Sequence, residues 1–388
     1  MPEAHVEVLL IGGGVAAVRC ARRLRRSGFG GSILIVGEEP HAPYNRPPLS
    51  KELLRDELPL ELASAEQATW YERHAVDLRT GVAVDRLDAR GRVATLADGS
   101  RIRFERCLIA TGAEPRRPPV PGAEHALLLR TLDDAVRLRT LARSGVRAVV
   151  IGGGFIGIEA ASSLAARGAS VTIFELAPLA WAGSLGAELS AWAAEMLAAE
   201  GVTLRTGVAA SRVEADAVWI ADERLPADLI LAGVGVRPRE DLARDAGLGC
   251  QDGLVTDASH ATSAPGIFAA GDVARVDGRR VEHWHAAREG GERAALAMLG
   301  KELTAARAPW VFSEFAGQQL DVVGFAPAWD ETVMLGDPRS GRFAVGYLRD
   351  GMVAQLAVVN AAIPVDEARS RLEVGMRADE LKALRRIG

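Results

Sequence analysis

The chain has 388 residues, more than a single hydrophobic core normally serves, so two or three domains are expected. Its composition, 48% hydrophobic and 25% charged, is that of a globular protein, and a formal net charge of −5 argues against nucleic-acid binding. The uncharged stretch 176–187 is short and broken by proline and glycine, which argues against a membrane span. The three cysteines, Cys20, Cys107 and Cys250, form no C-x-x-C pair, so we expect no metal site and a reducing, cytoplasmic setting.

The first predicted elements surround a glycine turn. Residues 6–36 are typical of a strand, a helix over 15–26 and a second strand. Between the first strand and the helix, the sequence Gly-Gly-Gly-Val-Ala-Ala fits the dinucleotide-binding pattern G-x-G-x-x-A. Gly12 permits the tight turn, and Gly14 lets the backbone approach a pyrophosphate that the helix N-terminus attracts. Glu38, just after the second strand, is placed to accept hydrogen bonds from a ribose.

Residues 39–121 are expected to complete the first domain. Several early prolines predict a loop, followed by a helix that begins near Ser50. Residues 82–95 alternate between apolar and polar side chains, a pattern typical of a small antiparallel meander. A buried strand is expected over 106–110, and the proline-rich segment 114–121 predicts a crossover into a second domain.

The second domain repeats this plan. Residues 147–174 predict a strand, a helix over 155–167 and a second strand, with the complete pattern G-x-G-x-x-G at 152–157. Glu175 ends the second strand. A carboxylate there would repel the 2′-phosphate of NADPH by roughly 3 kcal/mol at ~5 Å in an effective dielectric near ~20. Because no Lys or Arg lies between 176 and 188 to offset this repulsion, the sequence predicts NADH as the nucleotide.

The remaining chain is expected to return to the first domain and then to form a third. A lone apolar strand at 267–270 needs a sheet to join. Past Pro309 the pattern changes to alternating strands and a final helix near 378–386, which predicts a small α+β tail. The fold class is therefore α/β, with two Rossmann-like dinucleotide-binding domains and a small C-terminal α+β domain. The predicted boundaries are 1–115 with 237–307 for the first domain, 116–236 for the second and 308–388 for the third.

Two glycine turns in one chain predict two bound dinucleotides, one passing a hydride to the other across a shared cleft. Other stretches make a family resemblance specific, namely Pro43-Tyr44-Asn45-Arg46-Pro47-Pro48-Leu49-Ser50-Lys51, Leu129-Arg130-Thr131, 262–272 and Glu282-His283-Trp284. The chain resembles the FAD-dependent, putidaredoxin reductase-like ferredoxin reductases of cytochrome P450 and ring-hydroxylating dioxygenase systems, within the pyridine nucleotide-disulfide oxidoreductase superfamily. The resemblance implies that the first domain binds FAD and the second NADH.

The resemblance also implies individual FAD-binding residues. The glycine turn would hold the pyrophosphate, Glu38 the adenosine ribose and Asp272 the ribitol hydroxyls, while Trp284 would border the isoalloxazine ring. The full set implied for FAD is Gly12, Gly14, Val15, Ala16, Glu38, Arg46, Lys51, Val82, Ala110, Thr111, Gly112, Arg130, Gly271, Asp272, Glu282, His283 and Trp284.

A catalytic pair follows from the same resemblance. Lys51 and Glu159 would pair close to the flavin N5, where an ammonium stabilises electron density on the reduced ring. An ordinary exposed ion pair, which contributes little, is the alternative interpretation. The set implied for NADH is Gly152, Gly154, Phe155, Ile156, Gly157, Glu159, Glu175, Val234 and Gly235, and no metal ligands are expected.

Several positions set this chain apart from its relatives. Disulfide reductases carry a cysteine pair facing the flavin, whereas 45–51 contains no cysteine, so electrons are expected to leave to an external acceptor or to oxygen. Relatives usually carry two arginines roughly where Leu179 and Gly183 stand, and Trp181 is expected to give this region an apolar face. Further departures are Phe312 in place of a tryptophan, Phe315 in place of a glutamine and His285 in place of a neutral polar residue.

The implied function is hydride transfer from NADH to FAD, followed by single-electron transfer to a [2Fe–2S] ferredoxin that serves a cytochrome P450 or a dioxygenase. The alternatives are an NADH oxidase, a rubredoxin or nitrite reductase component, and an apoptosis-inducing-factor-like flavoprotein. An acidic ferredoxin would need a basic patch, although a solvated helix face explains the same arginines equally well. We expect no nucleic-acid or membrane partner, and either a monomer or a homodimer. The candidate patch residues are Arg288 and Arg293, with Arg339 and Arg342 as weaker choices.

Overall fold

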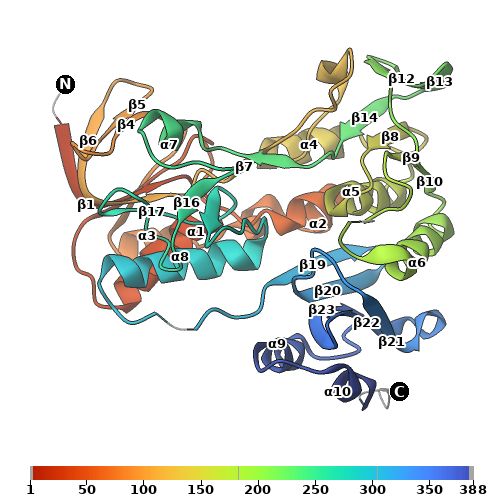
Figure 1. Cartoon of the computed structure of the whole chain (residues 1–388). Helices are drawn as coiled ribbons and strands as arrows, with labels where there is room; N and C mark the ends of the chain where they lie inside the picture. Colours follow the sequence, from red (N-terminus) through yellow and green to blue (C-terminus); the bar gives the residue numbers. More distant parts are fainter. Residues whose placement is uncertain (1–2, 182, 304, 384–388) are drawn as a thin grey trace. The chain divides into compact units, whose positions relative to one another are not determined.

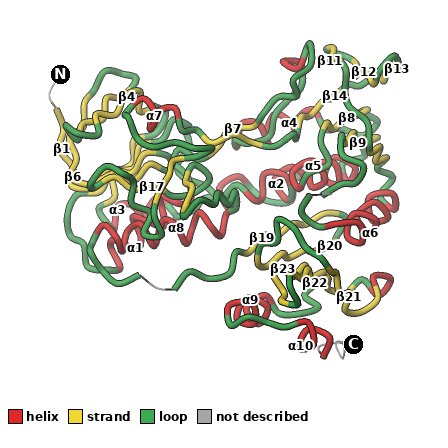
Figure 2. The backbone as a smooth tube through the Cα atoms, in the orientation of Figure 1, coloured by secondary structure: helices red, strands yellow, loops and turns green. Residues whose placement is uncertain are grey.

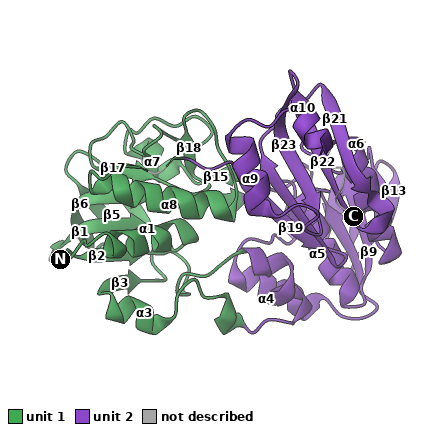
Figure 3. Cartoon of the chain, turned by 90° about the horizontal axis from the view of Figure 1, so that it is seen from below, with its two compact units in different colours: residues 1–46, 60–114, 236–305 green, residues 47–59, 115–235, 306–388 purple. Residues whose placement is uncertain are grey.

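The computed structural model describes residues 3–181, 183–303 and 305–383, which form two compact units. Figure 3 shows unit 1 in green and unit 2 in purple. None of the helices in the described part of the chain combines the length and the hydrophobicity needed to cross a lipid bilayer. Unit 1 comprises Met1–Arg46, Leu60–Glu114 and Val236–Ala305, and unit 2 comprises Pro47–Pro59, Pro115–Gly235 and Ala306–Gly388.

Unit 1 is built on one sheet whose central strand is buried on both faces. Along this strand, Val8 and Leu10 point to one side and Leu9 and Ile11 to the other, and each side belongs to a separate core cluster. The four strands around the center run parallel to one another, and the two strands at one edge turn back antiparallel. The strand order is β3 (Val76–Arg79), β2 (Ile33–Val36), β1 (Glu3–Ile11), β6 (Arg101–Ile109), β5 (Val93–Leu96) and β4 (Val84–Asp88), with β17 (Ile267–Ala269) beside β6.

Two long helices cover one face of this sheet and pack against each other (Figure 1). Their buried alanines, Ala17 in the first helix and Ala294 in the second, lie in the same core cluster as Val8 and Leu10. Small side chains at these positions allow the helices to approach closely. The helices of unit 1 are α1 (Val15–Arg26), α3 (Ala68–Arg73), α7 (Asp241–Asp245) and α8 (Trp284–Met298), and the short strands are β7 (Ala113–Pro115), β15 (Val236–Pro238), β16 (Leu254–Thr256) and β18 (Ala274–Val276).

The first sheet of unit 2 has four parallel strands. Its buried residues Val149, Phe174 and Ile230 pack against Val218 of a three-stranded antiparallel sheet. The parallel order is β10 (Thr203–Thr206), β9 (Ser170–Glu175), β8 (Arg147–Ile151) and β14 (Leu229–Ala232), and the antiparallel order is β11 (Arg212–Glu214), β12 (Ala217–Ile220) and β13 (Glu223–Pro226). The accompanying helices are α2 (Glu52–Arg55), α4 (Leu132–Leu141), α5 (Phe155–Ala166) and α6 (Gly186–Ala199).

The C-terminal part of unit 2 is a five-stranded antiparallel sheet followed by two helices (Figure 2). Ala368 and Leu381, one from each helix, belong to the same buried cluster as Leu356 and Val358 of the sheet, so both helices pack on it. The order is β19 (Trp310–Phe315), β20 (Gln318–Gly324), β23 (Met352–Val359), β22 (Arg342–Arg349) and β21 (Glu331–Asp337), followed by α9 (Val365–Glu373) and α10 (Ala378–Ala383).

The predicted fold class is confirmed. The meander over 82–95 is present as β4 and β5, and the lone strand near 267–270 joins the first sheet beside β6. The final helix begins at Ala378 as expected, while Arg386 lies outside the described residues. The segment Pro47–Pro59 clusters with unit 2, and the three-domain boundaries stay a prediction.

Candidate functional site

Unit 1 holds the first glycine turn between β1 and α1. Gly12 has φ of +115°, and a Cβ at this position would collide with the carbonyl oxygen of Ala110. Two features therefore exclude a side chain at Gly12: the positive φ of the backbone and the close approach of the segment after β6. At Gly14, the N-cap of α1, a Cβ would meet no atom within 4 Å, and no side chain caps the helix. The first backbone N–H groups of α1 are therefore left uncapped by any side chain, which suits the binding of a pyrophosphate.

The other residues implied for FAD in unit 1 gather near this turn. A Cβ at Gly271 would lie 3.4 Å from the Cβ of Ala16, so the turn before Asp272 borders α1. Burial disfavours charge on Arg46, but Tyr44, Glu39 and Asp272 outweigh it and raise the pKa of the guanidinium. Arg46 therefore lies within the field of Asp272, as a site built from both residues requires.

Two further sequence motifs meet in unit 1 at Trp284. Its indole nitrogen donates to Oδ1 of Asn45 (3.0 Å), and His283 caps the helix that Trp284 begins. Glu282 forms an ion pair with Arg280. The structure therefore places the 282–284 motif beside the start of the 43–51 motif.

Glu38 and Val82, the residues predicted to meet the adenosine of FAD, lie along the chain after β2. Glu38 is exposed, and its Oε2 lies 2.5 Å from Nη1 of Arg239. Val82 donates its backbone N–H to the Gly37 carbonyl (3.1 Å), and its contact with an adenine stays a prediction. Thr111 donates its hydroxyl to the Arg239 carbonyl (2.7 Å), which places the segment after β6 against the Arg239 backbone.

Unit 2 holds the second glycine turn between β8 and α5. Gly152 has φ of +111°, and a Cβ there would collide with the Gly233 carbonyl oxygen, so Val234 and Gly235 follow directly at the turn. Gly154 is open, as Gly14 is in unit 1. A Cβ at Gly157 would collide with the carbonyl oxygen of Gly152, so this third glycine is required for close packing.

Glu175 is held rigidly beside the second turn. Its Oε2 accepts the backbone N–H of Gly153 (2.6 Å) and its Oε1 that of Ala177 (2.7 Å). Within the described chain, Glu175 forms no ion pair with an Arg or Lys. An uncompensated carboxylate at this point suits a ribose diol and repels a phosphate.

The expectation that Trp181 forms an apolar face is wrong. Trp181 is 6% exposed, because its ring packs on Phe155 (5.3 Å between centroids) and on Phe315 (5.5 Å). Phe155 follows the glycine turn and Phe315 ends β19, so this aromatic contact joins the two. The apolar surface of the loop comes instead from Leu176 and Leu179, while Ile156 is exposed at the start of α5.

Lys51 and Glu159 are brought together in unit 2. Lys51 Nζ lies 2.6 Å from Glu159 Oε2, and both side chains are at least 95% buried. The alternative of an exposed ion pair is therefore excluded. Sequence reasoning missed two neighbours, Ser50 and Ser313, whose hydroxyls donate to the two oxygens of Glu159. Ser50 stands inside the 43–51 motif, which was the available signal.

Arg130 lies just before α4 in unit 2. Its backbone N–H donates to Oδ2 of Asp134 (3.0 Å), beside the capping box in which Thr131 and Asp134 close the N-terminus of the helix. This arrangement fixes the backbone at Arg130. Its role toward FAD stays a prediction.

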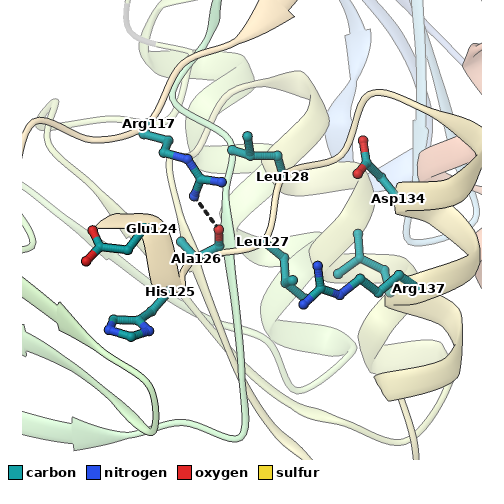
Figure 4. Close-up of a pocket in the computed structure, with 9 residues that line it drawn as sticks. Arg117, Glu124, His125, Ala126, Leu127, Leu128, Asp134 and Arg137 are labelled. Carbon is teal, nitrogen blue, oxygen red and sulfur yellow. Dashed lines mark hydrogen bonds between the residues drawn. The ribbon is translucent and has the colours of Figure 1, made fainter. Parts of the chain in front are cut away.

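A cavity of about 290 Å³ in unit 2 lies in residues 117–138 (Figure 4). Arg117 crosses it and donates to the carbonyls of Ala123 (2.8 Å) and Ala126 (2.6 Å). Of the described residues that line it, none belongs to the predicted nucleotide sites. Its described lining therefore contains no residue of the second glycine turn, which lies in the same unit.

Comparison with known proteins agrees with this arrangement. The family described as Pyridine nucleotide-disulphide oxidoreductase matches residues 6–291, and the Reductase C-terminal family matches residues 310–384. The chain is similar to the biphenyl dioxygenase system ferredoxin–NAD(+) reductase component of Paraburkholderia xenovorans (strain LB400), with 36% identity covering 91% of this chain and 90% of the relative.

Two further similarities point the same way. The benzene 1,2-dioxygenase system ferredoxin–NAD(+) reductase subunit of Pseudomonas putida is 37% identical, covering 91% of this chain and 89% of the relative. The structure resembles that of the covalent putidaredoxin reductase–putidaredoxin complex, with a TM-score of 0.91 and 31% identity over 95% of this chain and 93% of that one. The chain belongs to the pyridine nucleotide-disulphide oxidoreductase family.

Proposed function

We propose that this protein is an FAD-dependent NADH:ferredoxin reductase. The observation that carries the proposal is the presence of two glycine turns of the same construction, each with an open glycine at a helix N-cap and an acid at or just after the end of the next strand. Bound FAD accepts a hydride and releases electrons one at a time, which suits a two-electron donor and a one-electron acceptor. The relatives named as ferredoxin reductases support the same assignment.

Lys51 and Glu159 are the proposed catalytic pair. The buried ammonium of Lys51 would stabilise electron density delivered to the flavin, and Glu159 would hold that ammonium in place. Lys51 Nζ also lies 5.6 Å from the centroid of the Phe312 ring, a cation–π distance. No proton transfer is required of either residue in the hydride step.

Glu175 is the proposed specificity residue for NADH. Its two backbone hydrogen bonds fix the carboxylate, and no described cation forms an ion pair with it. The expected penalty of roughly 3 kcal/mol against a 2′-phosphate corresponds to about a hundredfold in affinity. We therefore expect NADH to be preferred to NADPH.

The proposed partner is an acidic [2Fe–2S] ferredoxin that serves a cytochrome P450 or a ring-hydroxylating dioxygenase in the cytoplasm. The guanidinium of Arg288 stacks 4.6 Å above the Trp284 ring, and burial together with the nearby charge of Arg288 lowers the pKa of Arg19. Two arginines from α1 and α8 thus crowd one region of unit 1, as an acidic partner would favour. Arg293 is less suited, because its guanidinium donates to the Ala258 carbonyl (2.9 Å).

The proposal is tested by NADH-driven cytochrome c reduction with and without an added [2Fe–2S] ferredoxin. We expect the rate to depend on the ferredoxin, and the Arg288→Glu variant to need several-fold more ferredoxin because steering is lost. Arg349→Glu, the same charge change at an exposed position of β22 outside the candidate patch, serves as the control. Rapid oxygen consumption with no response to ferredoxin would instead favour an NADH oxidase.

Flavin reduction without turnover of any acceptor would favour the apoptosis-inducing-factor-like alternative, and a response to rubredoxin alone would favour a rubredoxin reductase. Sedimentation of the purified protein distinguishes the monomer from the homodimer.

A further inference from the structure

The carboxylate of Glu159 is held at both of its oxygens by residues far away in the sequence. Oε2 accepts from Lys51 Nζ (2.6 Å) and from the Ser50 hydroxyl (2.5 Å). Oε1 accepts from the Ser313 hydroxyl (2.6 Å), which among the described residues is its only donor. Two stretches of unit 2, Pro47–Pro59 and β19, therefore converge on one side chain of α5.

The burial of these groups makes each donor matter. Ser313 is fully buried and Ser50 is 2% exposed, so water cannot replace a lost hydroxyl at either oxygen. A buried carboxylate is stable only when a counter-charge and hydrogen bonds compensate for the water it has lost. Lys51 supplies the charge at Oε2, and Ser313 alone compensates Oε1.

Strand β19 also reaches the other member of the pair. Phe312, the residue before Ser313, has its ring centroid 5.6 Å from Lys51 Nζ, and the Pro47 carbonyl accepts from the same ammonium (3.1 Å). Two consecutive residues of the C-terminal strand thus contact both partners of the ion pair. Moving β19 or removing the Ser313 hydroxyl would release one side of the carboxylate.

We propose that Ser313 is a positioning residue, which fixes the Glu159 carboxylate and through it the Lys51 ammonium. The C-terminal sheet then takes part in flavin reduction through the Lys51–Glu159 pair that Ser313 holds. The effect of Ser313 on flavin reduction rests on the function proposed above for Lys51. Its effect on the position of the Lys51 ammonium does not.

Ser162 offers a matched control, since it lies on α5 one helical turn after Glu159. Like Ser313, Ser162 is buried. It donates to Glu200 Oε2 (2.7 Å) and accepts from the backbone N–H of Ala316 (2.8 Å). It links α5 to the residue after β19 without touching Lys51 or Glu159. A purely structural role for Ser313 would therefore make Ser313→Ala and Ser162→Ala alike.

The test follows the reactivity of Lys51 toward an amine reagent. The chain has three lysines, and Lys301 and Lys382 are exposed, so they serve as internal references in the same sample. Trace acetylation of the FAD-loaded enzyme, read by peptide mass spectrometry, gives the labelling rate of Lys51 relative to these two. Because a hydrogen bond to a charged group is lost, we expect Ser313→Ala to raise that ratio about tenfold and Ser162→Ala to change it less than twofold.

Two variants keep the test decisive. Ser313→Cys retains the volume with a weak donor and should give an intermediate ratio. Adding Ser313→Ala to Glu159→Gln should change the ratio no further, because Ser313 acts through Glu159. An unchanged ratio in Ser313→Ala, or an equal rise in Ser162→Ala, overturns the proposal.

Stopped-flow reduction of the flavin by NADH tests whether the positioning of Lys51 by Ser313 matters for catalysis. We expect Ser313→Ala to lower the limiting rate of flavin reduction about tenfold with the NADH KM changed less than twofold, because the group acts on the transition state and not on nucleotide binding. If Lys51 becomes reactive while Ser313→Ala and Lys51→Met both reduce the flavin at the normal rate, the positioning of Lys51 stands and the catalytic role proposed for it falls.

Discussion

The two glycine turns share one backbone conformation and differ in the contacts of the acidic residue that follows each of them, Glu38 or Glu175. In both, the first glycine has φ above +110° and lies against a carbonyl oxygen, and the N-cap glycine is open. In unit 1, Glu38 is exposed and neutralised by Arg239. In unit 2, Glu175 is fixed by two backbone amides and keeps its charge uncompensated among the described residues. We therefore expect the two turns to receive a pyrophosphate in the same way and to recognise the ribose in two different ways.

The third position of the pattern also differs between the turns. Ala17 in α1 is fully buried and accommodated, whereas a Cβ at Gly157 in α5 would collide with the Gly152 carbonyl oxygen. The difference shows that a pattern position can tolerate alanine in one copy and exclude it in the other. Packing at the individual turn decides this, since both copies have the same chain order of strand, turn and helix.

The largest effect is expected from Gly157→Ala. Forced overpacking beside the turn should destabilise unit 2 by about 1–3 kcal/mol and weaken NAD+ binding up to about a hundredfold. Calorimetric titration with NAD+ and thermal unfolding measure the two effects. The control, Ala17→Gly, costs at most ~1 kcal/mol and leaves NAD+ affinity unchanged. Equal NAD+ affinities in the wild type and Gly157→Ala would break the comparison.

The next largest effect is expected from Glu175→Gln. This change removes the charge and keeps one of the two acceptors for the backbone N–H groups, so the ratio of kcat/KM for NADH to that for NADPH should fall by up to about a hundredfold. Steady-state ferredoxin-linked assays with both nucleotides give the ratio. Glu188→Gln, which removes an exposed charge from α6, should leave it unchanged. A wild-type enzyme that uses NADPH as well as NADH would contradict the account of Glu175.

A smaller effect is expected from Arg239→Ala in the first turn. The Glu38–Arg239 pair has 53% and 43% of its side-chain surfaces exposed, so its net contribution is ~1 kcal/mol or less and is screened by salt. FAD should therefore dissociate at most about fivefold faster, and the difference should vanish at high ionic strength. Glu38→Ala, which removes the ribose acceptor itself, should have the larger effect. A loss of FAD in Arg239→Ala that persists in high salt would show that the arginine contacts the nucleotide.

No effect on electron transfer is expected from the cysteines. Burial raises the pKa of the Cys20 and Cys107 thiols far above the ordinary value, so both stay protonated and unreactive across neutral and mildly alkaline pH. Burial also raises the pKa of the half-exposed Cys250. A thiol reagent should label Cys250 alone in the native protein, and Cys250→Ser should reduce its flavin at the wild-type rate. Slower reduction in that variant would indicate a thiol in the electron path.

Local patterns predicted both glycine turns, because strand, turn and helix are encoded by adjacent residues. The Lys51–Glu159 pair joins residues more than 100 positions apart, so it came from family resemblance and not from periodicity. The role of Ser313 was not predicted, because its partner Glu159 lies 154 positions away in the sequence and no neighbouring residue indicates that contact. The burial of Trp181 was not predicted, because it depends on a contact with Phe315 in the C-terminal sheet. Helices α6 and α9 were missed, the first because apolar residues cover most of its surface and the second because it is short.

The central claim, that one chain holds FAD at its first turn and receives hydride from NADH at its second, is tested most directly by anaerobic titration of the purified protein with NADH. We expect a yellow protein whose oxidised flavin absorbance is bleached by about one equivalent of NADH, with NADPH far less effective at matched concentration. Purification of a correctly folded protein that binds no FAD, or a bound flavin that NADH leaves oxidised, would contradict it.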